Sequence, residues 1–295
     1  MAAMHPELKW RIAAAALAVG AGEVVGLWAA TVVVTPVADS WMSETPLRPP
    51  PIGINPVRAG TTGGGVRVRG IFRFDLSGMI PVGAVVRSAT FTVQVTTVPS
   101  FDVQNSLFEL RRVLQGWEEA SVSWNERSPG SAWNSPGASA AGDVAGTASA
   151  TAFVSATGSY TFGSSDPLVA DVQAWVNSPG ANFGWRLHTQ SESTPRTARL
   201  FASREADATI RPSLSVTYDL PATPPTLTVL PVANGELRFS FPAEANRPYV
   251  VEARDFFGVG AWGAVLNLPA PGAATVLTVT NPVVGGAGFF RVRTP

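Results

Sequence analysis

The stretch Ala89–Thr96 reads Ala-Thr-Phe-Thr-Val-Gln-Val-Thr, with apolar and polar residues alternating without a break. Successive side chains of a β-strand point to opposite faces, so this pattern predicts a strand with one buried face and one solvated face. Such strands are typical of antiparallel sheets packed as a sandwich. The stretch therefore predicts an all-β fold of the sandwich class.

A second stretch, residues 66–74, alternates in the same way and carries three arginines. The two sets are Val66, Val68, Phe72 and Phe74 on one parity and Arg67, Arg69 and Arg73 on the other. We expect the first set to face the core and the arginines to lie on one outer face, about 7 Å apart at alternate positions. Guanidinium groups bind carboxylates in a bidentate manner, so this face is a candidate site for an acidic polysaccharide. The alternative is a solvated face, or one paired with acidic residues of neighbouring strands.

Composition favours many short strands over long helices. The 295 residues include 28 Gly and 25 Pro, and charged residues make up 14%. This length has room for two modest β domains, each with its own core. The formal net charge is zero, which argues against a general nucleic-acid-binding surface.

Several kinds of site are excluded by missing residue types. The chain has no cysteine and two histidines, His5 and His188. Disulfides, thiolate nucleophiles, cysteine zinc sites and multi-histidine metal sites are therefore excluded within one chain. Lys9 is the sole lysine, so nearly all the positive charge is arginine.

Residues 1–30 have the pattern of an export signal. Lys9 and Arg11 precede the apolar run Ile12–Ala21, and small residues follow it. We predict cleavage near Ala30 and a first strand at Thr31–Val34, which places the protein outside the cell or on its surface. A membrane anchor is the alternative, but the apolar run is shorter than the roughly 20 residues that span a bilayer. We therefore expect no stable membrane span in the mature chain.

The remainder divides into two parts. A single helix is expected at Asp166–Val176, with Asp166 as its cap and Pro167 in its first turn. Residues 220–225 form a proline-rich linker. After it, residues 226–295 contain several short strand patterns and predict a small immunoglobulin- or fibronectin-like sandwich.

Four segments within residues 31–219 carry a family resemblance. They are Trp117–Trp133 with its three tryptophans, Arg199–Glu205, Arg211–Tyr218 and Phe72–Ser77. Together they resemble the DNRLRE-type β-sandwich domains, a family that includes carbohydrate-binding modules of secreted bacterial and archaeal proteins. The resemblance implies a jelly-roll-like sandwich with one short helix. The loop at residues 47–56 departs from the family pattern, so ligand contacts that relatives make there do not transfer.

Aromatic residues are the other ligand candidates. Large aromatics within strand patterns usually fill a core, which is our expectation for Trp117, Trp124, Trp175 and Trp185. Trp41 and Trp133 lie among Pro, Gly, Ser and Asn, where a sugar-stacking platform and internal packing are both open. We include both in the candidate binding site with Arg67, Arg69 and Arg73.

Carboxylates are numerous but unmarked by any catalytic motif. The possible glycosidase pairs are drawn from Asp75, Glu118, Glu119, Glu126, Glu205 and Asp207. Surface charge, or ion pairing with Arg127 and Arg204, is the favoured interpretation, and no catalytic residue is predicted. No cofactor is expected, although Asp39, Asp143, Asp166 and Asp207 leave a structural calcium site open.

These features predict a secreted, non-catalytic protein that binds a polysaccharide or cell-surface glycan, with an acidic polysaccharide as the favoured ligand. A structural or adhesive surface protein is the first alternative, and a polysaccharide-degrading enzyme is the second. Binding predicts an exposed aromatic or arginine groove. An enzyme predicts a deep cleft that holds two close carboxylates, and an adhesive protein predicts exposed sheet edges.

Overall fold

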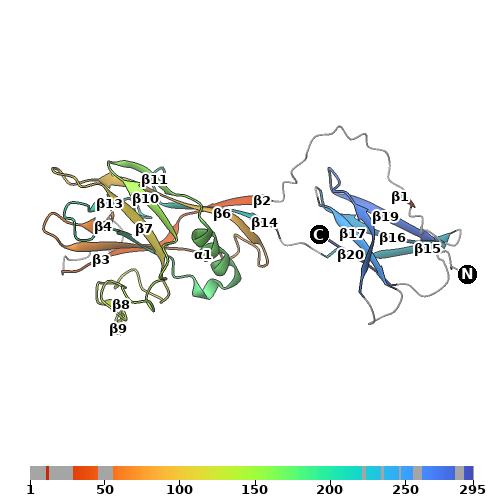
Figure 1. Ribbon diagram of the computed structural model, residues 1–295, viewed down its shortest axis with the longest axis horizontal. Coiled ribbons are helices and arrows are strands. Elements are labelled where there is room, and N and C mark those ends of the chain that lie inside the picture. The colour runs from red at the N-terminus through yellow and green to blue at the C-terminus, as the bar shows by residue number, and fades with distance from the viewer. Residues whose placement is uncertain are drawn as a thin grey trace, which may run out of the picture. The chain divides into compact units, whose positions relative to one another are not determined.

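The computed structural model describes residues 11–12, 29–45, 56–220, 224–233, 236–245, 247–254, 261–282 and 289–294. The backbone forms two compact units, one of Ala29–Pro221 and the other of Met1–Trp28 together with Ala222–Pro295. Both consist of antiparallel strands, and the described part of the chain contains one α-helix (Figure 1). The predicted all-β antiparallel sandwich class is confirmed.

Eleven strands of the Ala29–Pro221 unit form one continuous antiparallel sheet. They are β2 (Ala29–Val34), β3 (Pro36–Ser43), β4 (Val57–Thr61), β5 (Arg67–Phe74), β6 (Val85–Thr97), β7 (Ser106–Arg112), β10 (Ala150–Val154), β11 (Gly158–Phe162), β12 (Trp185–Thr189), β13 (Arg199–Phe201) and β14 (Ser213–Asp219). The sheet curls into two walls joined by β4. The first wall contains β10, β7, β12, β5 and β3, and the second wall contains β13, β6, β14, β2 and β11.

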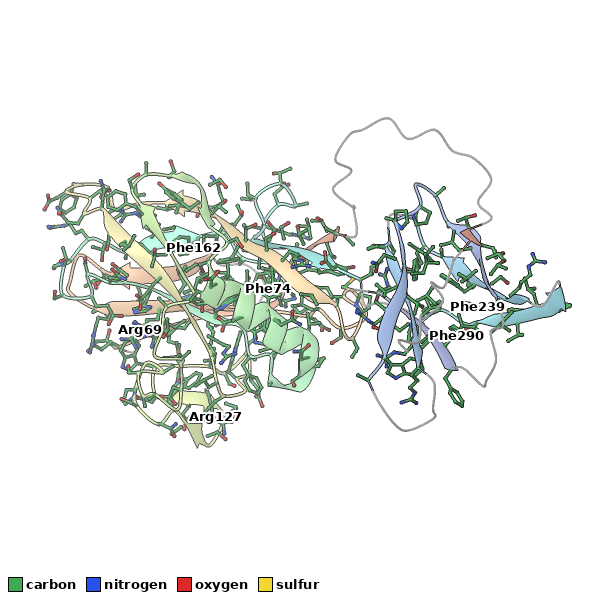
Figure 2. The ribbon with its side chains drawn as sticks, turned by 45° about the vertical axis from the view of Figure 1, so that its right-hand side comes forward. Arg69, Phe74, Arg127, Phe162, Phe239 and Phe290 are labelled. Carbon is green, nitrogen blue, oxygen red and sulfur yellow. The ribbon has the colours of Figure 1, made fainter. Side chains whose placement is uncertain are left out.

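The main core lies between the two walls. Phe72 and Phe74 of β5 reach Phe91 of β6, with ring centroids 5.3 and 5.6 Å apart. Figure 2 shows Phe74 and Phe162 inside this layer. Every apolar residue of the stretch Ala89–Thr96 is buried, as its alternation predicts.

The first and last strands of this unit are neighbours. β2 pairs antiparallel with β14, so that Ala29 lies opposite Asp219 and Val34 lies opposite Leu214. The first and the last residues of this unit therefore lie side by side, at the same end of the β2–β14 strand pair.

Helix α1 (Asp166–Asn177) packs its apolar side into the main core through Leu168, Val172 and Trp175. The predicted helix is confirmed, but its cap is Ser165, whose hydroxyl accepts a hydrogen bond from the Leu168 amide at 3.3 Å. Asp166 instead lies in the first turn, where a negative charge is favourable near the helix N-terminus. The short 3-10 helix η1 (Pro179–Ala181) follows.

The segment between β7 and β10 folds back over the outer side of the first wall. It contains the small hairpin of β8 (Glu126–Ser128) and β9 (Ser131–Ala132). Its tryptophans and valines pack on Ile71, Ala38 and Met42 and form a second, smaller core. We call residues 114–149 the covering loop. Arg127 is labelled on it in Figure 2.

The other unit contains two smaller antiparallel sheets. One has the order β1 (Arg11–Ile12), β19 (Thr275–Pro282), β16 (Glu236–Ala243) and β15 (Thr228–Ala233), and the other has β18 (Gly263–Leu268), β17 (Tyr249–Arg254) and β20 (Phe289–Arg293). They share a core in which Phe241 contacts Tyr249 with ring centroids 5.2 Å apart. An immunoglobulin-like identity for this unit stays a prediction.

Two boundary predictions fall mainly outside the described residues. Of the leader predicted for residues 1–30, Arg11 and Ile12 pair with β19, and Ala29 and Ala30 belong to β2. The division between the units falls after Pro221, within the predicted linker. Export, the cleavage position and independent folding of the two parts stay predictions.

Candidate functional site

The outer side of β5 carries the three candidate arginines. Arg67, Arg69 and Arg73 point away from the main core, as their parity predicts, together with Ile71. Ile71 is fully buried beneath the covering loop. The expectation that this face is open to solvent is therefore wrong at its centre, because a segment distant in sequence packs on it.

Arg69 lies beneath the covering loop, and 5% of its surface is exposed. Its guanidinium donates from Nε and Nη2 to the two carboxylate oxygens of Glu192, both at 2.7 Å. Nη1 donates to the Gly137 carbonyl at 2.6 Å and to the Ser139 hydroxyl at 2.8 Å, and Cζ lies 4.8 Å from the centre of the Trp124 ring. Arg69, labelled in Figure 2, therefore joins the loop to the sheet, and its guanidinium binds groups of this chain.

Arg67 lies at the open margin of the same face. It forms a bidentate pair with Glu44, with distances of 3.0 and 2.5 Å, and its side chain is 40% exposed. Hydrogen bonding to Arg67 lowers the pKa of Glu44 to about 2. Cζ also lies 5.4 Å from the Trp124 ring centre. Most of the Arg67 charge is thus compensated by a neighbour, which was the alternative left open by the sequence.

Arg73 is at the other end of β5 and is partly exposed. Its Cζ lies 5.4 Å from the centre of the Trp117 ring. Among the residues that the structure describes, no carboxylate forms an ion pair with it within 4.0 Å. Stacking on the tryptophan fixes the position of the guanidinium while its polar edge stays available.

The two candidate platform tryptophans are buried. Trp133 is 4% exposed and donates its indole N–H to the Ser123 carbonyl at 3.0 Å within the second core. Trp41 is 7% exposed and packs in the main core with Arg58 above its ring. The sequence left open whether these two tryptophans stack on sugars or pack internally. In the structure both pack internally. Core packing is confirmed for Trp117, Trp124, Trp175 and Trp185.

A buried polar network continues from Arg69 across the outer side of the first wall, onto β12 and β7. Nη1 of Arg186 donates to the carbonyls of Gly137 and Ala138, and Nε2 of His188 lies 3.1 Å from a carboxylate oxygen of Glu109. Burial lowers the pKa of His188 and that of Arg186. Burial alone would raise the pKa of Glu109, but hydrogen bonds from His188, Arg111 and Gln190 outweigh it and hold this pKa below its usual value. The network fixes the covering loop from below.

An acidic cluster surrounds Arg204 at the edge of β3. The Arg204 Nε lies 2.8 Å from a carboxylate oxygen of Glu119 and 2.8 Å from one of Glu205. Asp39 accepts a hydrogen bond from the Arg204 amide at 2.6 Å, and its own amide donates to Glu119. Burial, reinforced by the charges of Glu205 and Glu119, raises the pKa of Asp39 to about 7. The sequence pattern singled out Glu119 and Glu205 but gave Asp39 no acid–base role.

The other possible acid or nucleophile residues lie apart from this cluster. Asp75 and Asp207 accept hydrogen bonds from nearby turn residues, and Glu118 and Glu126 are exposed on the covering loop. The pairing expected for Arg204 is confirmed, whereas Arg127 donates to the Gly116 carbonyl instead. Glu119 and Glu205 share a single guanidinium, an arrangement unlike two carboxylates facing each other across a substrate.

The acidic residues considered for calcium are distributed over separate sites. Asp143 is fully buried and accepts hydrogen bonds from the amides of Asn134, Ser135 and Ala140 at 2.8, 3.0 and 3.1 Å. Asp39 belongs to the Arg204 cluster, Asp166 to α1 and Asp207 to its own turn. In the described ranges, no group of three or more His, Cys, Asp or Glu side chains is arranged to hold a metal ion.

No protein-family model and no curated protein matches this chain. The resemblance to DNRLRE-type domains therefore stays a prediction. No helix in the described part of the chain is both long enough and apolar enough to cross a membrane.

Proposed function

We propose that this chain is an exported, non-catalytic carbohydrate-binding protein, and that the two partly exposed ends of the arginine face, Arg73 above all and Arg67, contact an acidic polysaccharide. The observation that carries the proposal is the guanidinium of Arg73, which lies over Trp117 and forms no ion pair within 4.0 Å among the described residues; its charge acts on Asp75 at longer range. A carboxylate of a sugar chain would find a positioned, partly desolvated cation there.

The three arginines have different roles in this proposal. Arg73 is the main ligand contact. Arg67 lies about 20 Å away along β5, six residues distant at about 3.3 Å each, and contributes less because Glu44 already binds it. Arg69 supports the face from beneath through Glu192 and the covering loop. Trp41 and Trp133 are not ligand contacts in this proposal, because both are buried.

A non-catalytic role agrees with how the carboxylates are used. Glu119 and Glu205 are bound to the same arginine, and Asp39 is buried beside them. A glycosidase requires one carboxyl group on each side of the scissile bond, roughly 5 to 9.5 Å apart across a cleft. The export signal in residues 1–30 places the protein where polysaccharides are found.

Calorimetric titration of the full-length protein with a uronate oligosaccharide tests the proposal. We expect the substitution Arg73→Ala to weaken binding about tenfold and Arg67→Ala to weaken it less, with binding decreasing as salt increases. Arg87→Ala is the matched control, since Arg87 is an exposed arginine on the second wall. Equal affinity of the wild type and the Arg73→Ala variant, or absence of uronate binding by the wild type, would contradict the proposal.

A further inference from the structure

The outer side of the second wall carries a regular array of hydroxyl groups. Along β6, β14 and β11, alternate residues are partly or fully exposed polar side chains, and their neighbours in sequence point into the main core. On β2 the outward residues are Ala29, Thr31 and Val33, so this strand adds one hydroxyl and an apolar border. The members are Thr90, Thr92, Gln94 and Thr96 of β6, Ser213, Ser215 and Thr217 of β14, Ser159 and Thr161 of β11, and Thr31 of β2. We call this set the hydroxyl face.

Strand pairing places these side chains in rows across the sheet. Thr161, Thr92 and Ser213 lie directly opposite one another on three adjacent strands, and Thr90 lies opposite Ser215 in the next row. Neighbouring strands are about 4.8 Å apart, and alternate residues are about 6.7 Å apart along a strand. The hydroxyls therefore repeat in two directions.

Hydrogen bonds within the rows orient some of the hydroxyls. The side-chain oxygens of Thr92 and Thr161 are 2.8 Å apart, and those of Thr31 and Thr217 are 3.0 Å apart. Threonine side chains on a strand have few accessible rotamers, so little conformational entropy is lost when a partner binds them.

The chemistry of the hydroxyl face indicates the type of partner. No member of the set is ionisable, and the nearest charges along β6 and β14, Arg87 and Asp219, bind each other at the end of the array. Arg211 is exposed just before β14 but lies outside the array, so the array itself offers a charged polymer no counter-charge. It offers donors and acceptors to another uncharged surface that is rich in hydroxyl groups.

We infer that the hydroxyl face binds a neutral polysaccharide whose chains are packed side by side in a regular solid. Both surfaces are uncharged, both combine hydroxyl donors with acceptors, and both repeat in two directions. This inference goes beyond the proposed function, because it concerns the opposite wall of the sandwich and a ligand without carboxylates.

A depletion assay with the full-length protein tests the inference, using microcrystalline cellulose and chitin as the insoluble probes. The test variant combines Thr90→Val, Thr92→Val and Ser215→Ala, which removes three hydroxyls and keeps the strand shape. We expect wild-type protein to leave solution with at least one of the solids and the variant to bind at least tenfold less tightly.

Two controls separate this site from the rest of the molecule. Thr151→Val removes an exposed strand hydroxyl of β10, on the first wall, and should bind like the wild type. Arg73→Ala should also keep its binding to the solids, even if its binding to uronates is lost. Circular dichroism establishes that each variant is folded. Equal binding by the wild type and the folded triple variant, or no binding of the wild type to either solid, would overturn the inference.

Discussion

The two outer faces of the sandwich use their polar residues in opposite ways. On the first wall, Arg69 is buried beneath the covering loop and pairs with Glu192, Arg67 pairs with Glu44, and Arg73 lies over Trp117. On the second wall, two pairs of hydroxyls bond each other, Thr92 with Thr161 and Thr31 with Thr217, and Thr96 donates to the Leu200 carbonyl. Charged side chains on a strand therefore do not by themselves identify a solvent-exposed surface. Their ion pairs and hydrogen bonds can hold another segment of the chain over the strand.

The comparison predicts that polar residues stabilise the first wall and contribute little to the stability of the second. Three measurements of stability test this difference between the walls.

The largest difference is expected between two neighbouring arginines. Replacing Arg69 by alanine leaves Glu192 without its buried partner and should lower the free energy of unfolding by about 3 to 5 kcal/mol. Replacing Arg67, which is more exposed, should lower it by about 1 kcal/mol or less. Urea unfolding of both variants measures the difference. Equal losses would show that burial beneath the covering loop does not distinguish the two pairs.

The acidic cluster should give stability a distinctive pH dependence. The pKa of Asp39 is raised to about 7 in the folded protein, so this group binds a proton more tightly there than in the unfolded chain. Its contribution to stability is therefore greatest near pH 4, falls as the pH rises through about 7, and changes little above that. The loss amounts to at most about 4 kcal/mol.

The substitution Asp39→Asn removes this titration, so the stability difference between variant and wild type should change between pH 4.5 and pH 8, in favour of the variant at pH 8. Urea unfolding at several pH values measures it. Glu44→Gln is the control, because the pKa of Glu44 is lowered from 4.5 to about 2 on folding, so both values lie at or below pH 4.5 and its contribution to stability changes little above that pH. A difference that is constant with pH would show that Asp39 is ionised throughout.

The smallest effect is expected on the second wall. The single substitution Thr92→Val removes one exposed hydroxyl–hydroxyl contact and should change the free energy of unfolding by less than about 0.5 kcal/mol. Thermal unfolding is sufficient to measure it. A loss above 2 kcal/mol would mean that the hydroxyl face is structural, and would remove the contrast between the walls.

The local pattern of the sequence predicted the strands well because alternation reports directly on burial. Phe72, Phe74 and Phe91 all lie where their parity places them. The helix was also predictable, although its cap is one residue earlier, at Ser165, whose hydroxyl reaches the Leu168 amide.

The candidate site was less predictable because its geometry depends on residues far apart in the chain. Arg69 is buried by a loop that begins more than forty residues later, and a strand pattern contains no information about such a cover. One local signal was available: Ile71 shares the parity of the arginines, and an isoleucine within a charged stripe indicates that something packs there. The raised pKa of Asp39 had no comparable signal, because Glu119 and Glu205 approach it from distant segments.

The pairing of β2 with β14 has a mechanical consequence. Because Ala29 lies beside Asp219, a force that pulls the two ends of the unit apart acts on the outermost pair of the ladder first. The hydrogen bonds between the two strands would then break one after another, as in a zipper, rather than all at once in shear. The Ala29–Pro221 unit is thus built to yield at low tension when loaded through its ends, a property better suited to a ligand-binding module than to a load-bearing spacer.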